Sequence, residues 1–219
     1  MELTIERTLR AAPVIPVLTI DNPDQAVPLA QTLVRAGLPV LEITLRTDAA
    51  RSSIQRIIAE VPGAIVGAGT VISTTQANDV AKLGCAFAVS PGYSADLLRA
   101  VADIGLPFLP GVSTAAEAMQ MAEHGYAMQK FFPAGPAGGV AFLRALKDPL
   151  PRIKFCPTGG VTAANALDYL ALPNVVCVGG SWVAPEQLIA AGHWANIEAL
   201  ARSAAVLTPS GLTNPGARL

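Results

Sequence analysis

Short apolar runs alternate with longer segments of helical periodicity along almost the whole chain. A short apolar run bounded by turn residues is typical of a buried strand, and apolar residues spaced three and four apart indicate a helix. Glycine closes several helical segments, at Gly37, Gly84, Gly105 and Gly125, as it commonly does at helix ends. The expected strands are 14–20, 39–44, 64–66, 86–89, 107–109, 126–132, 153–156 and 175–178. The expected helices are 24–36, 48–60, 74–83, 94–104, 114–124, 138–147, 162–171 and 184–206, the last interrupted near Gly192.

Eight strand–helix units predict an α/β fold in which helices cover a parallel sheet. Eight units also favour a closed (β/α)8 TIM barrel, and 219 residues lie near the compact end of its size range. An open doubly wound sheet is the alternative, but residues 67–72 lack the third glycine of the dinucleotide-binding fingerprint. The polar segment 2–12 predicts a short N-terminal helix. Residues 1–207 are expected to form one domain, and 208–219 a flexible C-terminal tail.

The composition narrows the class of protein. Only 14% of the residues are charged and 52% are hydrophobic, against about 25% charged in typical soluble domains, so much of the chain is expected to be interior or subunit interface. A net charge of −1 and 5% aromatic residues argue against nucleic acid and anionic membranes as partners. No apolar stretch approaches the roughly 20 residues that span a bilayer. The acidic N-terminus does not resemble a signal peptide, and we therefore expect a cytoplasmic protein.

Cysteine and histidine usage gives no indication of a metal site. Cys85, Cys156 and Cys177 are isolated from one another in apolar runs, which favours buried reduced thiols. His124 and His193 lie far apart, outside any metal-ligand motif. We expect no metal and no cofactor.

Lys130 is the first candidate for chemistry, because it lies inside an apolar run that ends in Phe-Phe-Pro. Strand alternation places Met128, Lys130 and Phe132 on one face. Apolar neighbours strip water from an ammonium group, which favours the neutral amine that attacks a carbonyl. The alternative is a lysine that extends to the surface at a strand end. Of the four lysines, however, only this one is expected at the carboxyl end of a barrel strand, where active sites of this fold lie.

A second cluster of polar residues comes from the strand 39–44. If the chain stays extended, Glu42, Thr44 and Arg46 share one face, which points into the barrel. An internal ion pair between Glu42 and Arg46 is the structural interpretation of this pattern. The catalytic interpretation is that Arg46 binds a substrate carboxylate while Glu42 transfers protons beside Lys130.

Glycine-rich turns follow several strands. Segments 157–161 and 178–182 each contain a Gly-Gly pair after the seventh and eighth strands, the usual phosphate-binding position in this fold. Backbone N–H groups at such turns approach an anion closely, and the start of a following helix adds a favourable dipole. The alternative is that these glycines only close tight turns. After the third strand, Thr70 is expected either to contact substrate or to cap the next helix.

Together these segments resemble a known family, the bacterial 2-keto-3-deoxy-6-phosphogluconate (KDPG) aldolases. The resemblance covers residues 10–206 in the correct order. Its motifs are Glu-Ile-Thr-Leu-Arg-Thr at 42–47, Val-Gly-Ala-Gly-Thr-Val at 66–71, Ser-Pro-Gly at 90–92, Pro-Gly-Val-Ser-Thr at 110–114, Lys-Phe-Phe-Pro-Ala at 130–134, Phe-Cys-Pro-Thr-Gly-Gly-Val at 155–161 and Gly-Gly-Ser-Trp at 179–182.

The resemblance implies a metal-free class I aldolase, a lyase that splits KDPG into pyruvate and glyceraldehyde 3-phosphate and that also cleaves 4-hydroxy-2-oxoglutarate (KHG). It also implies a homotrimer. The residues that match the family's functional positions are Lys130 for the Schiff base, Glu42 for proton transfer, Arg46 for the substrate carboxylate, Thr70 beside pyruvate, Thr158 for the choice of configuration at C4, and Gly159, Gly160, Gly180 and Ser181 for the phosphate.

Two other functions are compatible with the motifs. A synthase or isomerase barrel would use the same glycine turns to bind phosphate but would need no Schiff base at Lys130. A phosphosugar-binding protein without activity would need neither Lys130 nor Glu42, although both are present.

Overall fold

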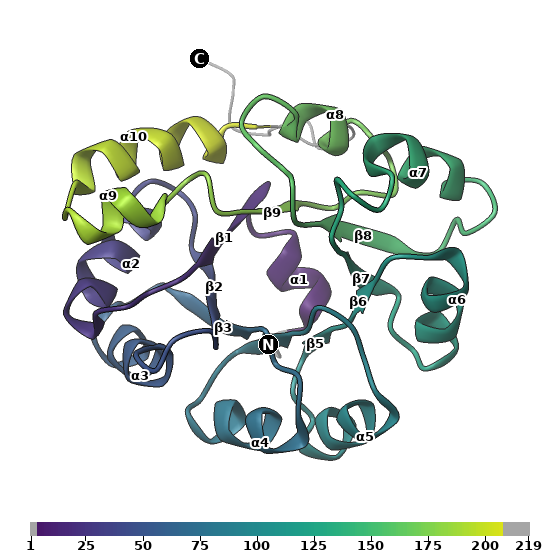
Figure 1. The fold of residues 1–219 in the computed structure, drawn as a ribbon, viewed down its shortest axis with the longest axis horizontal. Helices are drawn as coiled ribbons and strands as arrows, with labels where there is room; N and C mark the ends of the chain where they lie inside the picture. The colour runs from purple at the N-terminus through teal and green to yellow at the C-terminus, as the bar shows by residue number, and fades with distance from the viewer. Residues whose placement is uncertain (1–3, 208–219) are drawn as a thin grey trace.

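The computed structural model describes residues 4–207, and these form a ring of parallel strands surrounded by helices (Figure 1). The strands are β1 (Val14–Leu18), β2 (Val40–Thr44), β3 (Ile65–Gly69), β4 (Phe87–Val89), β5 (Phe108–Leu109), β6 (Gly111–Val112), β7 (Met128–Phe131), β8 (Lys154–Pro157) and β9 (Val178–Gly180). The helices are α1 (Ile5–Leu9), α2 (Ala26–Arg35, after a 3-10 turn at Pro23–Gln25), α3 (Ala50–Glu60), α4 (Thr74–Lys82), α5 (Ala95–Ile104), α6 (Ala115–Glu123), α7 (Gly139–Leu146), α8 (Ala166–Leu170), α9 (Glu186–Ala190) and α10 (Trp194–Ala205).

The pairing of the strands closes the barrel. One run of pairs has the order β5-β4-β3-β2-β1-β9 and the other β6-β7-β8, all of them parallel. Pro110 alone separates β5 from β6, and single bridges between Phe155 and Val175 and between Thr158 and Gly179 join the β8 and β9 segments. Strands β5 and β6 occupy a single position in the ring, so the nine strands of the described chain fill eight positions. The predicted (β/α)8 barrel is confirmed.

The apolar residues form two layers, as strand alternation requires. The larger layer lies between the strands and the surrounding helices. The smaller one fills the interior of the barrel and contains Leu9 of α1 together with Phe87, Val89 and Cys177. Helix α1 crosses the middle of the ring in Figure 1 and precedes the first strand. It covers the amino ends of the strands, and the polar side chains of the barrel interior lie at the carboxyl ends.

The last third of the chain differs most from the sequence prediction. The helix expected at 162–171 begins only at Ala166, because a turn from Thr162 to Asn165 comes first. The strand expected at 175–178 is β9, at Val178–Gly180. The interruption expected near Gly192 is confirmed, because the helical stretch 184–206 is divided there into α9 and α10. The expected C-terminal tail, 208–219, lies outside the described residues.

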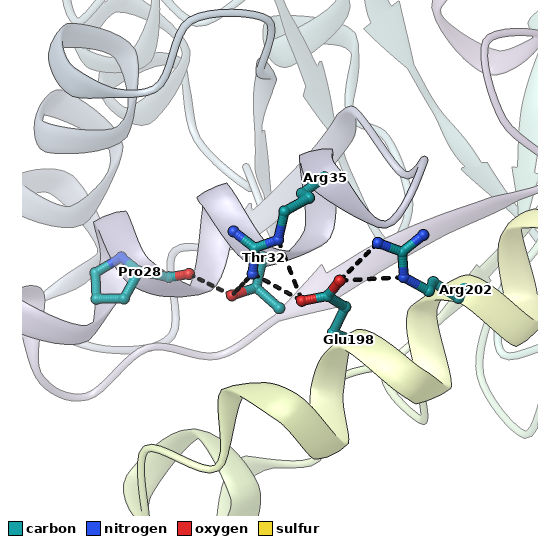
Figure 2. A network of polar contacts seen from close by, with 5 residues as sticks. All are labelled: Pro28, Thr32, Arg35, Glu198 and Arg202. Carbon is teal, nitrogen blue, oxygen red and sulfur yellow. Dashed lines mark hydrogen bonds and ion pairs between the residues drawn. The ribbon is translucent and has the colours of Figure 1, made fainter.

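Helices α2 and α10 are joined by a polar cluster that Figure 2 shows. Glu198 of α10 accepts hydrogen bonds from Arg35 of α2, at 2.8 Å, and from Arg202, at 2.7 Å. Arg35 also donates to the hydroxyl of Thr32, at 3.5 Å, which in turn donates to the carbonyl of Pro28. Hydrogen bonds from the two arginines lower the pKa of Glu198 to about 2. This cluster ties the last helix of the described chain to the first helix of the barrel ring.

The three cysteines are buried free thiols, as expected. Burial raises the pKa of Cys85 to about 12 and raises that of Cys177 well above its usual value, so both remain protonated near neutral pH. Between residues 4 and 207, no helix combines the length and the apolarity that crossing a bilayer demands.

Candidate active site

Lys130 lies in β7 with only 5% of its surface exposed, and its side chain reaches into the barrel. Its Nζ is 3.0 Å from Oε1 of Glu42, which is itself 3% exposed on β2. Strands β2 and β7 lie on opposite sides of the eight-position ring. The two side chains therefore meet across the interior of the barrel.

The surroundings of the lysine combine the two features expected from the sequence, an apolar face and the carboxylate of Glu42. Phe132 supplies the expected apolar face, with its ring centroid 5.3 Å from Nζ. The carboxylate of Glu42 is an additional and closer neighbour. Lys130 is therefore held as one member of a buried pair of opposite charge, rather than as an amine among apolar groups alone.

Gly69 of β3 makes room for the carboxylate. A Cβ at this position would lie 2.3 Å from Oε1 of Glu42 and 2.7 Å from its Cγ. Gly69 pairs with Thr44 in the parallel register. Any larger residue here would displace the glutamate from the lysine, so the glycine of the Gly-Ala-Gly motif has a packing reason as well as a turn reason.

The expected ion pair between Glu42 and Arg46 is wrong. Arg46 instead donates to two hydroxyls, at 3.2 Å to Thr44 Oγ1 and at 2.9 Å to Thr19 Oγ1. The hydroxyl of Thr44 donates in turn to the carbonyl of Leu18. Within residues 4–207 no carboxylate forms an ion pair with Arg46, so its guanidinium is oriented but not neutralised.

A cavity of about 180 Å³ opens at the carboxyl end of the barrel and brings most of the candidate residues together. Ser73, and not Thr70, caps α4, which excludes one of the two roles considered for Thr70. Thr70 has a positive φ of 61°, and it is the one non-glycine residue with this backbone conformation in the described chain. The residues that line the cavity are Val17, Glu42, Thr44, Arg46, Thr70, Pro91, Lys130, Phe132 and Thr158.

The glycine turns lie beside this cavity and not in its wall. Gly159 and Gly160 follow β8 with positive φ values of 88° and 81°, a conformation that glycine adopts without strain. Across the described residues, the N–H groups of Gly160 and Ser181 donate to no protein acceptor, while Gly159 lies at the parallel bridge between Thr158 and Gly179. Such unpaired amides are suited to bind an anion.

No helix begins directly after either glycine turn in this part of the chain, so the expected helix dipole does not point at them. Helix α8 begins at Ala166, six residues after Gly160, and α9 begins at Glu186, five residues after Ser181. Both helices are only 5 residues long. An anion at these turns would therefore meet backbone amides and the exposed Ser181, without a helix dipole behind them.

The second turn is shaped by an aromatic ring. A Cβ at Gly180 would lie 1.7 Å from the ring of Trp182. The ring therefore packs directly on the Gly180 backbone, which only glycine permits. A Cβ at the preceding Gly179 would likewise lie 2.3 Å from the hydroxyl of Thr158, so both glycines of this pair are needed for packing.

Sequence reasoning missed several residues at this end of the barrel. Val17 and Pro91 line the cavity, and Thr19 orients Arg46. Only the hydroxyl of Thr19 at the end of a strand could have indicated such a role. The expected exclusion of Lys154 holds, because its Nζ donates to the carbonyl of Pro173 at an exposed position.

These features define a class of protein. A closed parallel barrel with a buried lysine–glutamate pair, and with an oriented arginine in the same cavity, is a barrel enzyme suited to covalent amine chemistry on a keto acid. The pair can exchange a proton internally, which releases an amine without changing the net charge of the cavity.

Comparisons with known proteins identify the family. Residues 5–200 match the family described as "KDPG and KHG aldolase". The chain is 49% identical over 192 residues to the 2-dehydro-3-deoxy-phosphogluconate aldolase of Pseudoalteromonas atlantica, with 88% of this chain and 89% of that protein covered. It is 46% identical over 199 residues to the KHG/KDPG aldolase of Escherichia coli K12, covering 91% and 93%.

A solved structure gives the same result. The crystal structure of KDPG aldolase from Legionella pneumophila, in which pyruvate was captured at low pH as a covalent carbinolamine intermediate, superimposes with a TM-score of 0.91 at 42% identity. The superposition covers 94% of this chain and 100% of that one. The chain belongs to the KDPG and KHG aldolase family.

Proposed function

We propose that this chain cleaves KDPG to pyruvate and glyceraldehyde 3-phosphate through a Schiff base on Lys130. The observation that carries this proposal is the 3.0 Å contact between Lys130 Nζ and Glu42 Oε1 inside the cavity. A lysine with a proton acceptor at this distance can be converted into a nucleophile within a site that little water reaches.

The first half of the reaction forms the imine. Arg46 binds the carboxylate of the keto acid by charge-assisted hydrogen bonds, which places the C2 carbonyl beside Lys130. Glu42 takes a proton from the ammonium group, and the neutral amine attacks C2 to give a carbinolamine. Loss of water, with protonation of the leaving hydroxyl, gives an iminium ion that withdraws electrons from C3.

The second half breaks the carbon–carbon bond. Glu42 accepts the proton of the C4 hydroxyl, the C3–C4 electron pair moves to the iminium, and the aldehyde leaves with its new carbonyl at C4. The resulting enamine is protonated at C3. Water then hydrolyses the iminium, which releases pyruvate and restores the amine of Lys130.

The remaining residues position the substrate. We assign Thr70 to the pyruvate half and Thr158 to the C4 hydroxyl, because both line the cavity that holds Lys130. The amides of Gly159, Gly160 and Gly180 and the hydroxyl of Ser181 are assigned to the phosphate. Their support is the unpaired N–H group of Gly160 and the close backbone packing at Gly180, where only glycine fits against the ring of Trp182.

Borohydride reduction in the presence of pyruvate tests the Schiff base. We expect wild-type protein to gain one covalent pyruvyl adduct on the peptide that contains Lys130, and Lys130→Ala to gain none while keeping its circular dichroism spectrum. Lys154→Ala is the matched control, since this lysine lies on the next strand with its Nζ exposed. An adduct that persists in Lys130→Ala, or wild-type turnover by that variant, would refute the assignment and favour a barrel enzyme without a Schiff base.

The relative from Escherichia coli named KHG/KDPG aldolase supports a second substrate. We propose that this chain also cleaves KHG to pyruvate and glyoxylate, since the pyruvate half is the same. We further propose a cytoplasmic homotrimer built from one barrel domain over residues 1–207. Support for an extensive subunit interface is the charged fraction of 14%, and light scattering of the purified protein would test the trimer.

A further inference from the structure

The turn after β8 has its first two carbonyl groups fixed by the turn after β7. Ala134 N–H donates to the carbonyl of Thr158, and Gly135 N–H donates to the carbonyl of Gly159, both at 2.8 Å. A trans peptide is planar, so its N–H points away from its C=O. Fixing these two carbonyls therefore fixes the direction of the Gly159 N–H group, at the bridge between Thr158 and Gly179, and of the unpaired N–H group of Gly160.

The third peptide of the turn, between Gly160 and Val161, is fixed by a side chain instead. Asn165 Nδ2 donates to the carbonyl of Gly160 at 3.0 Å. Its Oδ1 accepts from the N–H of Thr162 at 2.8 Å, which anchors the amide group at both ends. The N–H of Val161, like that of Gly160, donates to no protein acceptor in the described chain.

We infer that Asn165 is a positioning residue for the phosphate-binding turn, and that it sets how strongly the enzyme prefers substrates that carry a phosphate. This inference rests on the proposed function. Asn165 is half-buried and does not line the cavity that contains Lys130. Asn165 acts by orienting the peptide between Gly160 and Val161. Of the carbonyls of Thr158, Gly159 and Gly160, only that of Gly160 is held by a side chain.

Two substitutions separate the parts of this contact. Asn165→Asp keeps the acceptor for Thr162 N–H, so the turn is retained, but it removes the donor to Gly160 and adds a negative charge near the phosphate. Asn165→Ala removes both hydrogen bonds. The matched control is Asn78→Ala, which also loses a bond from Nδ2 to a backbone carbonyl, that of Thr74 on α4, far from the barrel mouth in sequence and on the outer ring.

The test compares a phosphate-dependent with a phosphate-independent readout. We expect the KM for KDPG to rise about fivefold to tenfold in Asn165→Ala, the effect of losing the one neutral hydrogen bond that holds the Gly160 carbonyl, and at least tenfold in Asn165→Asp. The inhibition constant of inorganic phosphate should rise in parallel. The rate of borohydride trapping with pyruvate, which has no phosphate, should stay within twofold of wild type, and Asn78→Ala should change nothing.

Several outcomes would overturn the inference. An unchanged KM for KDPG in Asn165→Asp would show that the third peptide does not matter. Equal losses in KDPG cleavage and pyruvate trapping, or loss of folded structure in both variants, would show a merely structural role. A wild-type protein that traps no pyruvate at all would instead refute the proposed function, so the two failures are distinguishable.

Discussion

Removal of Lys130 should strand a carboxylate inside the barrel, and the cost can be worked from the structure. The side chains of Lys130 and Glu42 are 7% and 4% exposed and 3.0 Å apart. At an effective dielectric constant of about 20, unit charges at this distance attract by about 5 kcal/mol. Removing one partner of a buried pair costs about 3–5 kcal/mol. Lys130→Met keeps most of the side-chain volume and should therefore lower the free energy of unfolding by about 4 kcal/mol at neutral pH.

Urea denaturation followed by circular dichroism measures this loss, which corresponds to roughly 8–16 °C in Tm for a chain of this size. The double variant Lys130→Met/Glu42→Leu should recover most of the stability, since an apolar pair replaces the buried ions. The control is the same substitution at an exposed pair, Lys147 and Asp148, which lie 3.5 Å apart. Lys147→Met should lower the free energy of unfolding by less than about 0.5 kcal/mol.

The reasoning would be refuted if Lys130→Met were as stable as wild type at neutral pH, or if the double variant were no better than the single one. Either result would mean that the carboxylate of Glu42 finds another partner or water once the lysine is gone. The double-mutant cycle measures the coupling between the two positions directly.

Two further predictions concern positions outside the catalytic lysine. Gly69→Ala places a Cβ 2.3 Å from Glu42 Oε1 and should lower kcat for KDPG by about 100-fold while the protein stays folded; a kcat near the wild-type value would show that the carboxylate can move without consequence. Glu198 has a pKa lowered to about 2 from an ordinary value of 4.5, so the stability it contributes is present above about pH 4.5 and is lost as the pH falls toward 2. The difference in unfolding free energy between wild type and Glu198→Gln should therefore shrink over that range, and a difference that grows on acidification would contradict the assignment.

The sequence was sufficient to predict the barrel and the end of it where the reactive groups lie. Both follow from periodicity, because eight strand–helix units closed by glycines leave few other topologies. Lys130 stood out because its neighbours are apolar, and the alternation of side chains placed Glu42 and Arg46 on one inward face. All three line the same cavity.

The contacts between those groups were harder to predict. The pairing of Glu42 with Lys130 instead of Arg46 depends on which strands face each other across the ring and on the space that Gly69 leaves. The side chains of Thr19 and Asn165 make their hydrogen bonds in irregular segments, which have no periodic pattern. The late start of α8 has a similar cause, since the amide group of Asn165 bonds to backbone groups of the preceding turn and competes with a helical conformation there.

The buried pair also explains how a lysine can be both well held and reactive. Burying an ammonium group here without a partner would cost free energy. A neutral amine without a partner could be buried, but no group beside it could hold the proton that it exchanges during the reaction. With Glu42 at 3.0 Å, the proton that leaves Lys130 stays inside the site, and the net charge of the pair is zero before and after the transfer. The same carboxyl group can then give the proton to the departing hydroxyl, after which it is again a base when the C4 hydroxyl must be deprotonated. The proposal that one glutamate serves the proton transfers of the cycle rests on this placement, since β2 lies across the ring from β7 and Glu42 Oε1 is 3.0 Å from Lys130 Nζ.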